Sequence, residues 1–285
     1  MNRIFNKKNY FIVISIFIIL IVIASLYDLQ IANAINIGNN AFSTIFDAIG
    51  RIPATTASMV GASMVMASIN KDKSLILAFK IISIVGPCVY SLYHTYETIY
   101  ESLESLIAVG IVSIFLIFVF IFTYKKLSNY ENKKLLFFIG LFLVSIVCGT
   151  SLVALIFKKI MARPRYNFII DNPTLVSFKN WWQSSRDVKE VLVSQGIDSE
   201  MFKSLPSGHS VDSWCLTMLW LIPVFFTKKN NQLSLFIVGV IFGVLVMFSR
   251  MLCGAHFLSD VVFGAMITLV TQYICYIVYL KRFNE

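Results

Sequence analysis

The chain is dominated by long apolar runs that are separated by short polar segments. Hydrophobic residues make up 58% of its 285 residues, and charged residues only 14%. Most of the runs approach the ~20 residues that a membrane-spanning helix needs. This pattern predicts an all-α integral membrane protein, a helical bundle of about eight transmembrane spans, and excludes an ordinary soluble domain. The expected spans cover, approximately, residues 10–27, 53–69, 74–93, 105–124, 135–157, 209–227, 233–248 and 257–280.

The two N-terminal runs are the least typical spans. The run at 10–27 could be a signal peptide, because Ala32-Asn33-Ala34 resembles a cleavage site. It is longer than the ~7–15 apolar residues of such regions, so we expect an uncleaved first span. The run at 53–69 is near the ~17-residue lower limit for a span, but its small residues suit close helix packing. Between these runs, residues 41–49 are expected to form an interfacial helix.

The distribution of Lys and Arg predicts how the chain crosses the membrane. With eight spans and a cytoplasmic N-terminus, the cytoplasmic segments hold thirteen basic residues in short pieces. The opposite side then holds Arg51, Arg250 and the basic residues of segment 158–205. We therefore expect both termini in the cytoplasm. The thirteen residues are Arg3, Lys7, Lys8, Lys71, Lys73, Lys125, Lys126, Lys133, Lys134, Lys228, Lys229, Lys281 and Arg282.

Composition also excludes some function classes. The net charge of +9 does not indicate nucleic-acid binding, because the basic residues lie mainly in the short segments between apolar runs. The histidine at position 94 has no obvious partner, so His94 is expected to be structural. The cysteines show neither metal-ligand spacing nor a disulfide pattern; they are Cys88, Cys148, Cys215, Cys253 and Cys275.

Polar residues at the end of one apolar run and the start of the next suit phosphate chemistry. His256 and Asp260 are four residues apart, so a helix beginning near Phe257 places them on one face. The carboxylate can then accept a proton from one ring nitrogen and leave the other as a nucleophile or base. Arg250 closes the preceding run, where its planar fork can grip a phosphate.

Two other stretches supply further phosphate-binding groups. Lys158 and Arg165 follow the fifth run and provide cations from another helix end. Ser207 and Gly208 begin the sixth run, where free backbone N–H groups and the helix dipole favour an anion. The following residue, His209, is a candidate acid or base.

Together these stretches resemble the three signatures of the type 2 phosphatidic acid phosphatase superfamily. The signature Ser-Arg-x5-His-x3-Asp is complete at Ser249–Asp260, and Pro-Ser-Gly-His is complete at Pro206–His209. The signature Lys-x6-Arg-Pro matches at Lys158 and Arg165, but Tyr166 replaces its proline. The resemblance covers about a third of the chain.

The replaced proline leaves two interpretations open. A proline would fix the backbone after Arg165, so Tyr166 either leaves that arginine less rigidly aimed or stacks on a substrate group. We expect Tyr166→Pro to keep activity within about tenfold. The only Arg-Pro pair nearby is Arg163-Pro164, which is the alternative phosphate-binding arginine. Otherwise Lys159 and Arg163 are expected to be surface charges.

The resemblance also implies roles for the site residues. His256 would attack phosphorus and form a phosphohistidine, and Asp260 would orient it and make it more basic. His209 would protonate the leaving oxygen and then activate water. No cofactor and no metal are implied, because the cations do the work that a divalent metal would do. The residues implied to bind phosphate are Lys158, Arg165, Ser207, Gly208 and Arg250.

The predicted function is that of a metal-independent lipid phosphate or diphosphate phosphatase, of the undecaprenyl diphosphate or phospholipid phosphate type. Its expected partners are the lipid substrate and the bilayer. The charge distribution puts all three signatures on the extracytoplasmic face of the cytoplasmic membrane. The expected organisation is a single membrane domain, residues 1–285, with accessory spans in 1–133 and a phosphatase core in 134–280 that carries an extracytoplasmic loop, 158–206.

Three alternatives have different consequences. A phosphotransferase would pass the phosphoryl group from the same phosphohistidine to a lipid or sugar instead of water. A lipid-phosphate binder or transporter would lack turnover, but few polar groups lie within the spans, and none of the signature histidines or arginines is missing. A vanadate haloperoxidase shares the signatures and is disfavoured by the eight expected spans.

Overall fold

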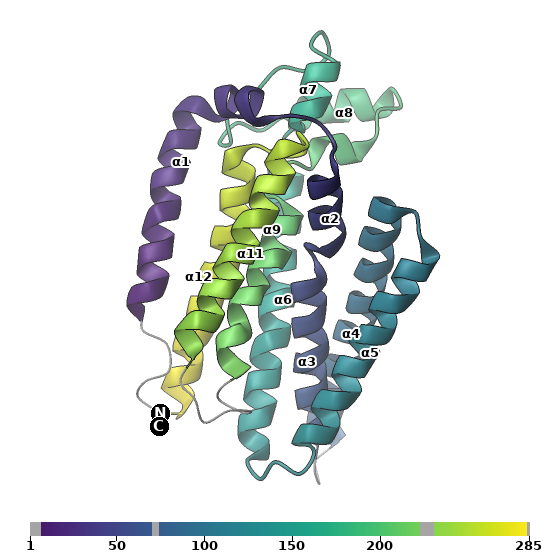
Figure 1. Cartoon of the computed structure of the whole chain (residues 1–285), viewed down its shortest axis with the longest axis vertical. Helices are drawn as coiled ribbons and strands as arrows, with labels where there is room; N and C mark the ends of the chain where they lie inside the picture. Colours follow the sequence, from purple (N-terminus) through teal and green to yellow (C-terminus); the bar gives the residue numbers. More distant parts are fainter. Residues whose placement is uncertain (1–6, 70–73, 223–230, 284–285) are drawn as a thin grey trace. The chain divides into compact units, whose positions relative to one another are not determined.

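A computed structural model describes residues 7–69, 74–222 and 231–283, and every regular element in these ranges is helical (Figure 1). The all-α fold class is therefore confirmed. The chain packs as two compact units. One, which we name the core unit, contains the chain up to Asp47 together with Thr150–Val270. The other, the accessory unit, contains Ala48–Gly149 together with the chain from Thr271.

The accessory unit is built mainly from α3, α4, α5 and the first part of α6. Two glycines bring α3 and α6 together, because a β-carbon on Gly61 would lie 2.9 Å from the carbonyl oxygen of Gly140. Any larger side chain there would push the helices apart. The predicted close packing of residues 53–69 is confirmed. The bounds are Ile52–Ala67 for α3, Ser74–Leu103 for α4, Leu106–Leu127 for α5 and Lys133–Met161 for α6.

Helix α4 extends beyond the apolar run that predicts it. The polar residues after Tyr93 continue the helix to Leu103 instead of forming a connecting segment. They make polar contacts of their own. His94 Nδ1 lies 3.0 Å from Glu97 Oε2 and 3.2 Å from Arg51 Nη1. The third histidine therefore has partners that the sequence did not reveal, within the accessory unit.

The core unit holds the remaining helices and the end of α6. Trp214 ties three of them together. Its ring lies 2.7 Å from where a β-carbon on Gly243 of α11 would be, and it meets Phe17 of α1 edge-on at 5.0 Å. The bounds are Lys7–Ile35 for α1, Ala41–Ile49 for α2, Tyr166–Asp171 for α7, Arg186–Ser194 for α8, Ser199–Phe202 for η1, Gly208–Ser213 for α9, Trp214–Leu221 for the 3-10 helix η2, Gln232–Leu252 for α11 and Leu258–Phe283 for α12.

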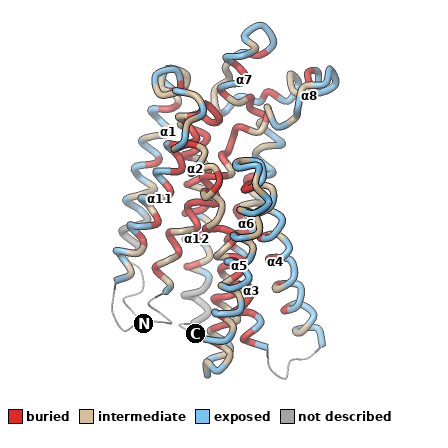
Figure 2. The backbone as a smooth tube through the Cα atoms, turned by 45° about the vertical axis from the view of Figure 1, so that its right-hand side comes forward, coloured by how far each residue is buried: buried red, intermediate tan, exposed pale blue. Residues whose placement is uncertain are grey.

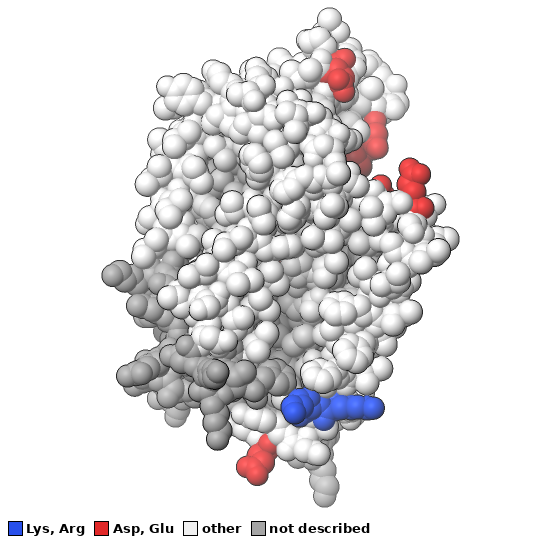
Figure 3. Space-filling model, viewed as in Figure 1, with Lys and Arg blue, Asp and Glu red and all other residues white. Residues whose placement is uncertain are grey.

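Six helices in the described ranges are long and apolar enough to cross a membrane, so the chain is a multi-pass membrane protein. Exposed residues predominate along α1, α4 and α5 in Figure 2. The described part of the face in Figure 3 carries few charged side chains, as lipid contact requires. Helix α3 has only 16 residues, and residues 223–227 of the sixth expected span lie outside the described residues. The count of eight spans stays a prediction.

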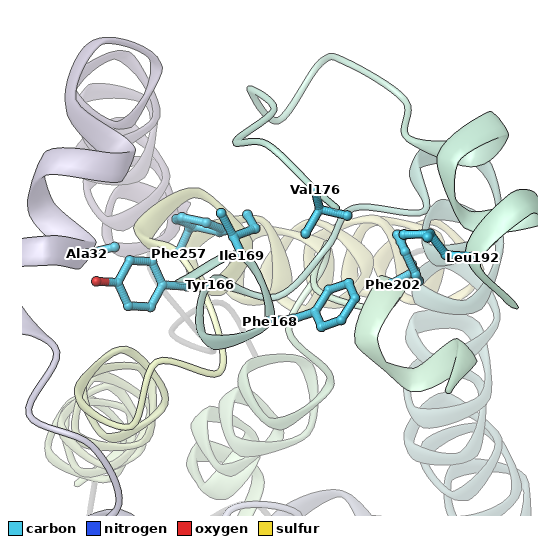
Figure 4. Close-up of a cluster of buried hydrophobic side chains, with 8 residues drawn as sticks. All are labelled: Ala32, Tyr166, Phe168, Ile169, Val176, Leu192, Phe202 and Phe257. Atoms are coloured by element: carbon cyan, nitrogen blue, oxygen red, sulfur yellow. The ribbon is translucent and has the colours of Figure 1, made fainter. Parts of the chain in front are cut away.

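The polar segment between α6 and α9 folds back on a small hydrophobic core of its own (Figure 4). The segment includes helix α8, whose Leu192 is buried in this core. Trp181 docks the segment on α1 and α12, because its Nε1 donates to Ser25 Oγ at 2.9 Å and its ring packs on Phe263. The cluster comprises Ala32, Tyr166, Phe168, Ile169, Val176, Leu192, Phe202 and Phe257.

Candidate active site

The turn between α11 and α12 holds His256 beside Arg250. The carbonyl oxygen of Arg250 accepts hydrogen bonds from the backbone N–H groups of Ala255 and His256, both at 3.2 Å. Gly254 has a φ of +68°, a left-handed conformation that glycine adopts without strain. Its carbonyl accepts from the N–H of Asn167 at 3.0 Å, which ties the turn to α7. The local sequence therefore fixes where the histidine backbone lies.

A backbone carbonyl sets the proton position on His256. Nδ1 lies 2.8 Å from the carbonyl oxygen of Ser204, which can only accept a hydrogen bond. The neutral ring therefore carries its proton on Nδ1 and has an unprotonated Nε2. Asp260 Oδ2 is 3.8 Å from Nδ1, beyond hydrogen-bond range. In the structure the carbonyl of Ser204 makes the short hydrogen bond to Nδ1, and the carboxylate of Asp260 faces the same nitrogen at ion-pair distance.

Asp260 acts on the histidine through Ser204 because its own oxygens are already engaged. Oδ2 accepts from the hydroxyl of Ser204 at 2.5 Å and from the N–H of Phe257 at 2.9 Å. Oδ1 accepts from Arg163 Nη1 at 2.7 Å. The aspartate therefore holds Ser204, whose carbonyl orients His256, and Phe257, which follows His256 in the chain.

Burial and two cations keep His256 neutral. The pKa of His256 is lowered from its ordinary 6.5 to about 4, mainly by burial; the hydrogen bond and charge of Asp260 oppose this shift, and the positive charges of Arg165 and Arg250 add to it. Both arginines therefore lie close enough to act on this ring. At neutral pH the ring has a lone pair on Nε2 and cations nearby, an arrangement that suits attack on an anionic phosphate.

Arg163 lies in the protein interior, and its predicted place on the surface is wrong. It is 1% exposed, because four partners compensate for removing its charge from water. Nη2 donates to Asp28 Oδ2 at 2.9 Å, while Nη1 donates to Ser259 Oγ and to Asp260. Nε donates to the carbonyl of Lys179. The alternative that Arg163 grips phosphate is disfavoured by this complete set of partners.

The Pro-Ser-Gly-His signature is held against Asp260. The N–H of Ser207 donates to the backbone carbonyl of Asp260 at 3.0 Å, and Ser207 Oγ caps α9 by accepting from the N–H of Ser210. Gly264 of α12 allows this approach, since a β-carbon there would lie 2.6 Å from the carbonyl oxygen of Ser207. Ser207, Gly208 and the following histidine are therefore fixed beside the start of α12.

His209 and Arg250 meet at a third residue, Asp47 of α2. His209 Nε2 lies 2.9 Å from Asp47 Oδ1, and Arg250 Nη1 forms an ion pair with the same oxygen. The Nε of Arg250 is buried and has no hydrogen-bond partner among the residues that the structure describes. Two predicted site residues that are 41 positions apart thus share one carboxylate that the sequence analysis did not single out.

Arg165 is held by the segment before α9. Its backbone N–H donates to the carbonyl of Met201 at 2.9 Å, and its Nε donates to the carbonyl of Glu200 at 3.1 Å. Lys158 lies half-buried in the last turn of α6, seven residues earlier, and its contact with phosphate stays a prediction. Lys159 is exposed, as expected.

Tyr166 is a core residue. It is 4% exposed, its hydroxyl donates to Asn33 Oδ1 at 3.0 Å, and its ring meets Phe257 edge-on at 5.7 Å. In Figure 4 its hydroxyl oxygen points to the side of Ala32. The interpretation that Tyr166 stacks on a substrate is therefore wrong. The ring instead braces the turn that carries His256.

The residues that sequence reasoning missed come mostly from the N-terminal segment. Asp28 ends the first apolar run, and an acidic residue at membrane depth indicates function or a buried pair by default. Asp47 lies on the polar face of α2 with Ser43 and Thr44, so its position in the sequence gives no sign of a role in the site. Ser204 acts largely through its backbone carbonyl, which no sequence pattern marks. In the described ranges no group of three His, Cys, Asp or Glu residues is arranged to hold a metal ion.

The family comparison agrees with this geometry. The family model of the PAP2 superfamily matches residues 139–284, just over half of the chain. The chain therefore belongs to the PAP2 superfamily, a membership that supports phosphatase-type activity on lipid phosphates. No curated protein and no solved structure matches the chain. The matched segment includes the three signatures but neither Asp28 nor Asp47.

Proposed function

We propose that this chain is a membrane-embedded lipid phosphate or diphosphate phosphatase that works through a phosphohistidine on His256. The observation that carries the proposal is the proton position on this ring. The Ser204 carbonyl holds the proton on Nδ1 and leaves Nε2 as a nucleophile, within reach of the charges of Arg165 and Arg250. A neutral imidazole between cations is the arrangement that attack on a phosphate needs.

In the first step, the Nε2 lone pair forms a bond to phosphorus and the bond from phosphorus to the leaving oxygen breaks. His209 gives its proton to that oxygen. In the second step, His209 takes a proton from water, and the resulting hydroxide breaks the N–P bond and releases inorganic phosphate. The enzyme returns to its starting state, with His256 neutral and His209 protonated.

Charge neutralisation comes from the cations around the phosphate. Arg250 contributes a buried Nε–H that has no acceptor in the described part of the chain, which is the kind of donor that a phosphate oxygen would satisfy. Arg165 and Lys158 supply further positive charge, and Ser207 and Gly208 supply donors at the start of α9. These groups do the work that divalent metal ions do in other phosphoryl-transfer sites, so we expect activity to survive EDTA.

The substrate class follows from the surroundings of the site. The apolar helices favour a lipid-linked phosphate, and undecaprenyl diphosphate or a phospholipid phosphate suits the extracytoplasmic side that the distribution of Lys and Arg predicts. A cysteine at the exposed position Gln195 should then react with an impermeant thiol reagent in intact cells, and one at Glu131 only after lysis. The reverse pattern would move the chemistry to the cytoplasmic face.

The direct test is phosphate release from a panel of purified lipid monophosphates and diphosphates by the chain in detergent. We expect release from at least one of them, in the presence of EDTA, and none from the His256→Ala variant. Loss of activity in EDTA that Mg²⁺ restores would contradict the metal-free mechanism. Transfer of the phosphoryl group to an added lipid or sugar without release of phosphate would identify a phosphotransferase instead.

A further inference from the structure

The carboxylate of Asp47 joins two groups to which the proposed mechanism gives different tasks. Its Oδ1 lies 2.9 Å from His209 Nε2 and pairs with Arg250 Nη1. The backbone carbonyl of Asp47 is also near His209 Nε2, at 3.2 Å. The side chain is 29% exposed, whereas its two partners are about one tenth exposed. Asp47 therefore sits at the rim of the cluster and closes one side of it.

Helix α2 holds Asp47 firmly in this place. Phe42 and Phe46 on the same helix pack against Phe248 and Phe242 of α11. At the start of the helix, the N–H of Ser43 donates to the side chain of Asn40, and the Asn40 N–H donates to Ser43 Oγ, both at 3.0 Å. The reciprocal cap stabilises the start of the helix, and the aromatic contacts hold the helix against α11.

We propose that Asp47 is a positioning residue for the phosphatase reaction, which keeps His209 oriented and charged as the proton donor. The inference rests on the proposed function and deepens it. With Nε2 held by the carboxylate of Asp47, the ring keeps one orientation and its protonated form is favoured, so that it has a proton to pass to the leaving oxygen. With Nη1 held by Asp47, the Nε edge of the Arg250 fork is left for a phosphate oxygen.

The charges around His209 explain why such a residue is needed. A nearby arginine disfavours the protonated imidazole, and a hydrogen-bonded carboxylate favours it. Among the contacts that the structure describes, the ring of His209 faces Asp47 from α2, and Arg250 from α11 pairs with the same carboxylate; Asp212 lies three residues along the helix of His209. Without Asp47, the positive charge of Arg250, which binds phosphate, would disfavour the protonated form of His209, which is needed to protonate the leaving group.

A different role for Asp47 would give different kinetics. A carboxylate on an arginine and a histidine also resembles a phosphate, so Asp47 could instead occupy the phosphate position until substrate displaces it. In that case its removal would strengthen substrate binding and lower KM. The firm anchoring of α2 favours the positioning role, and the two roles predict opposite results.

The test compares Asp47→Asn with the wild type on a prenyl monophosphate and the diphosphate of the same prenyl chain. The diphosphate expels a phosphate monoester, whose second pKa is about 6, and the monophosphate expels an alkoxide, with a pKa of about 16. Acid assistance is worth about 10²–10⁴-fold and matters most for the alkoxide. We expect Asp47→Asn to lower kcat about 10–100-fold on the monophosphate and less than about threefold on the diphosphate.

A double variant shows whether the loss passes through the histidine. In a His209→Ala background, adding Asp47→Asn should lower kcat on the monophosphate less than about twofold further, because the proton donor has already been removed. Asp47→Glu should recover part of the activity. Equal losses on both substrates, or full additivity with His209→Ala, would overturn the positioning role. A lower KM with an unchanged kcat would identify the phosphate-like role instead.

Histidine NMR separates failure of this inference from failure of the proposed function. The chain has only three histidines, so ¹⁵N-histidine spectra can be assigned with His209→Ala. We expect the protonated form of His209 at pH 7 in the wild type and its loss in Asp47→Asn. If the wild type cleaves no lipid phosphate, the proposed function fails, and an unchanged histidine spectrum would still refute the role of Asp47.

Discussion

Two arginine–carboxylate clusters in the core unit look alike in composition and differ in exposure. In the first, Arg163 joins Asp28 and Asp260, and all three side chains are at most 1% exposed. In the second, Arg250 joins Asp47, which is 29% exposed, and His209. The first cluster has a partner for each Arg163 nitrogen, whereas in the second the Nε of Arg250 has none within the described ranges.

The difference separates architecture from chemistry. A sealed, fully paired cluster cannot accept a phosphate without breaking its own bonds, and the charges left behind would be costly in a buried place. An open cluster with an unused donor can accept an anion at little cost. We therefore assign Arg163 to holding the site together and Arg250 to binding the substrate, although both arginines lie within or beside a family signature.

The largest expected effect is on stability, and it comes from breaking the sealed cluster. Arg163→Leu leaves Asp28 and Asp260 without their shared cation and should lower the free energy of unfolding by about 3–5 kcal/mol. The matched variant Arg250→Leu removes a more exposed pair and should cost about 1 kcal/mol or less, while abolishing most activity. Thermal unfolding in detergent, with activity measured below the transition, compares the two. Equal stabilities would contradict the assignment.

A somewhat smaller effect is expected at Tyr166. Its buried ring and its hydrogen bond to Asn33 change the earlier expectation that proline is tolerated there. Tyr166→Pro fits the backbone at the first residue of α7 but removes the ring, so it should lower the free energy of unfolding by about 3 kcal/mol. Tyr166→Phe should cost only about 1 kcal/mol. Similar stabilities for the two variants would show that the ring does not brace the His256 turn.

The smallest expected effect is on the acid side of the pH profile. Because burial lowers the pKa of His256 to about 4, the nucleophile of the free enzyme stays about 90% neutral at pH 5. Lowering the pH from 6.5 to 5 should therefore change kcat/KM less than about twofold through this group, and the loss should come as pH approaches 4. With an ordinary pKa of 6.5, only about 3% would be neutral at pH 5.

A second substrate with a different phosphate pKa provides the control for that profile. If the pH at which kcat/KM falls differs between the two substrates, the titrating group is the substrate phosphate. If that pH is the same for both, the titrating group belongs to the enzyme. An enzyme group that titrates near 6.5 would mean that His256 is less buried or less influenced by Arg165 and Arg250 than the structure indicates.

The sequence predicted much of the fold because apolar length and helix bounds are local properties. Residues 41–49 form the expected helix α2, and the last two runs become α11 and α12 with ends within about four residues. The polar continuation of α4 was missed because its residues form a helix without being apolar. Neither the span count nor the membrane side follows from the structure alone.

The part of the candidate site that the sequence predicted consists of side chains at the fixed spacings of the signatures. His256, Asp260 and Ser207 lie together as the signatures suggest. Asp28 and Asp47 come from distant parts of the chain, and the sequence does not predict which arginine each of them pairs with. Which of Arg163 and Arg165 binds phosphate also depends on which of them is buried. The two residues are only two positions apart, and the sequence does not show this difference.

The most direct test of the account is to trap the phosphorylated enzyme. A lipid diphosphate labelled with ³²P at its terminal phosphate would be mixed with the wild type, His209→Ala and His256→Ala, and then quenched in alkali, where a phosphohistidine survives. We predict strong label on His209→Ala, because His209 is needed to release phosphate, and none on His256→Ala. Label on His256→Ala, or none on a His209→Ala variant that still turns over, would contradict His256 as the nucleophile.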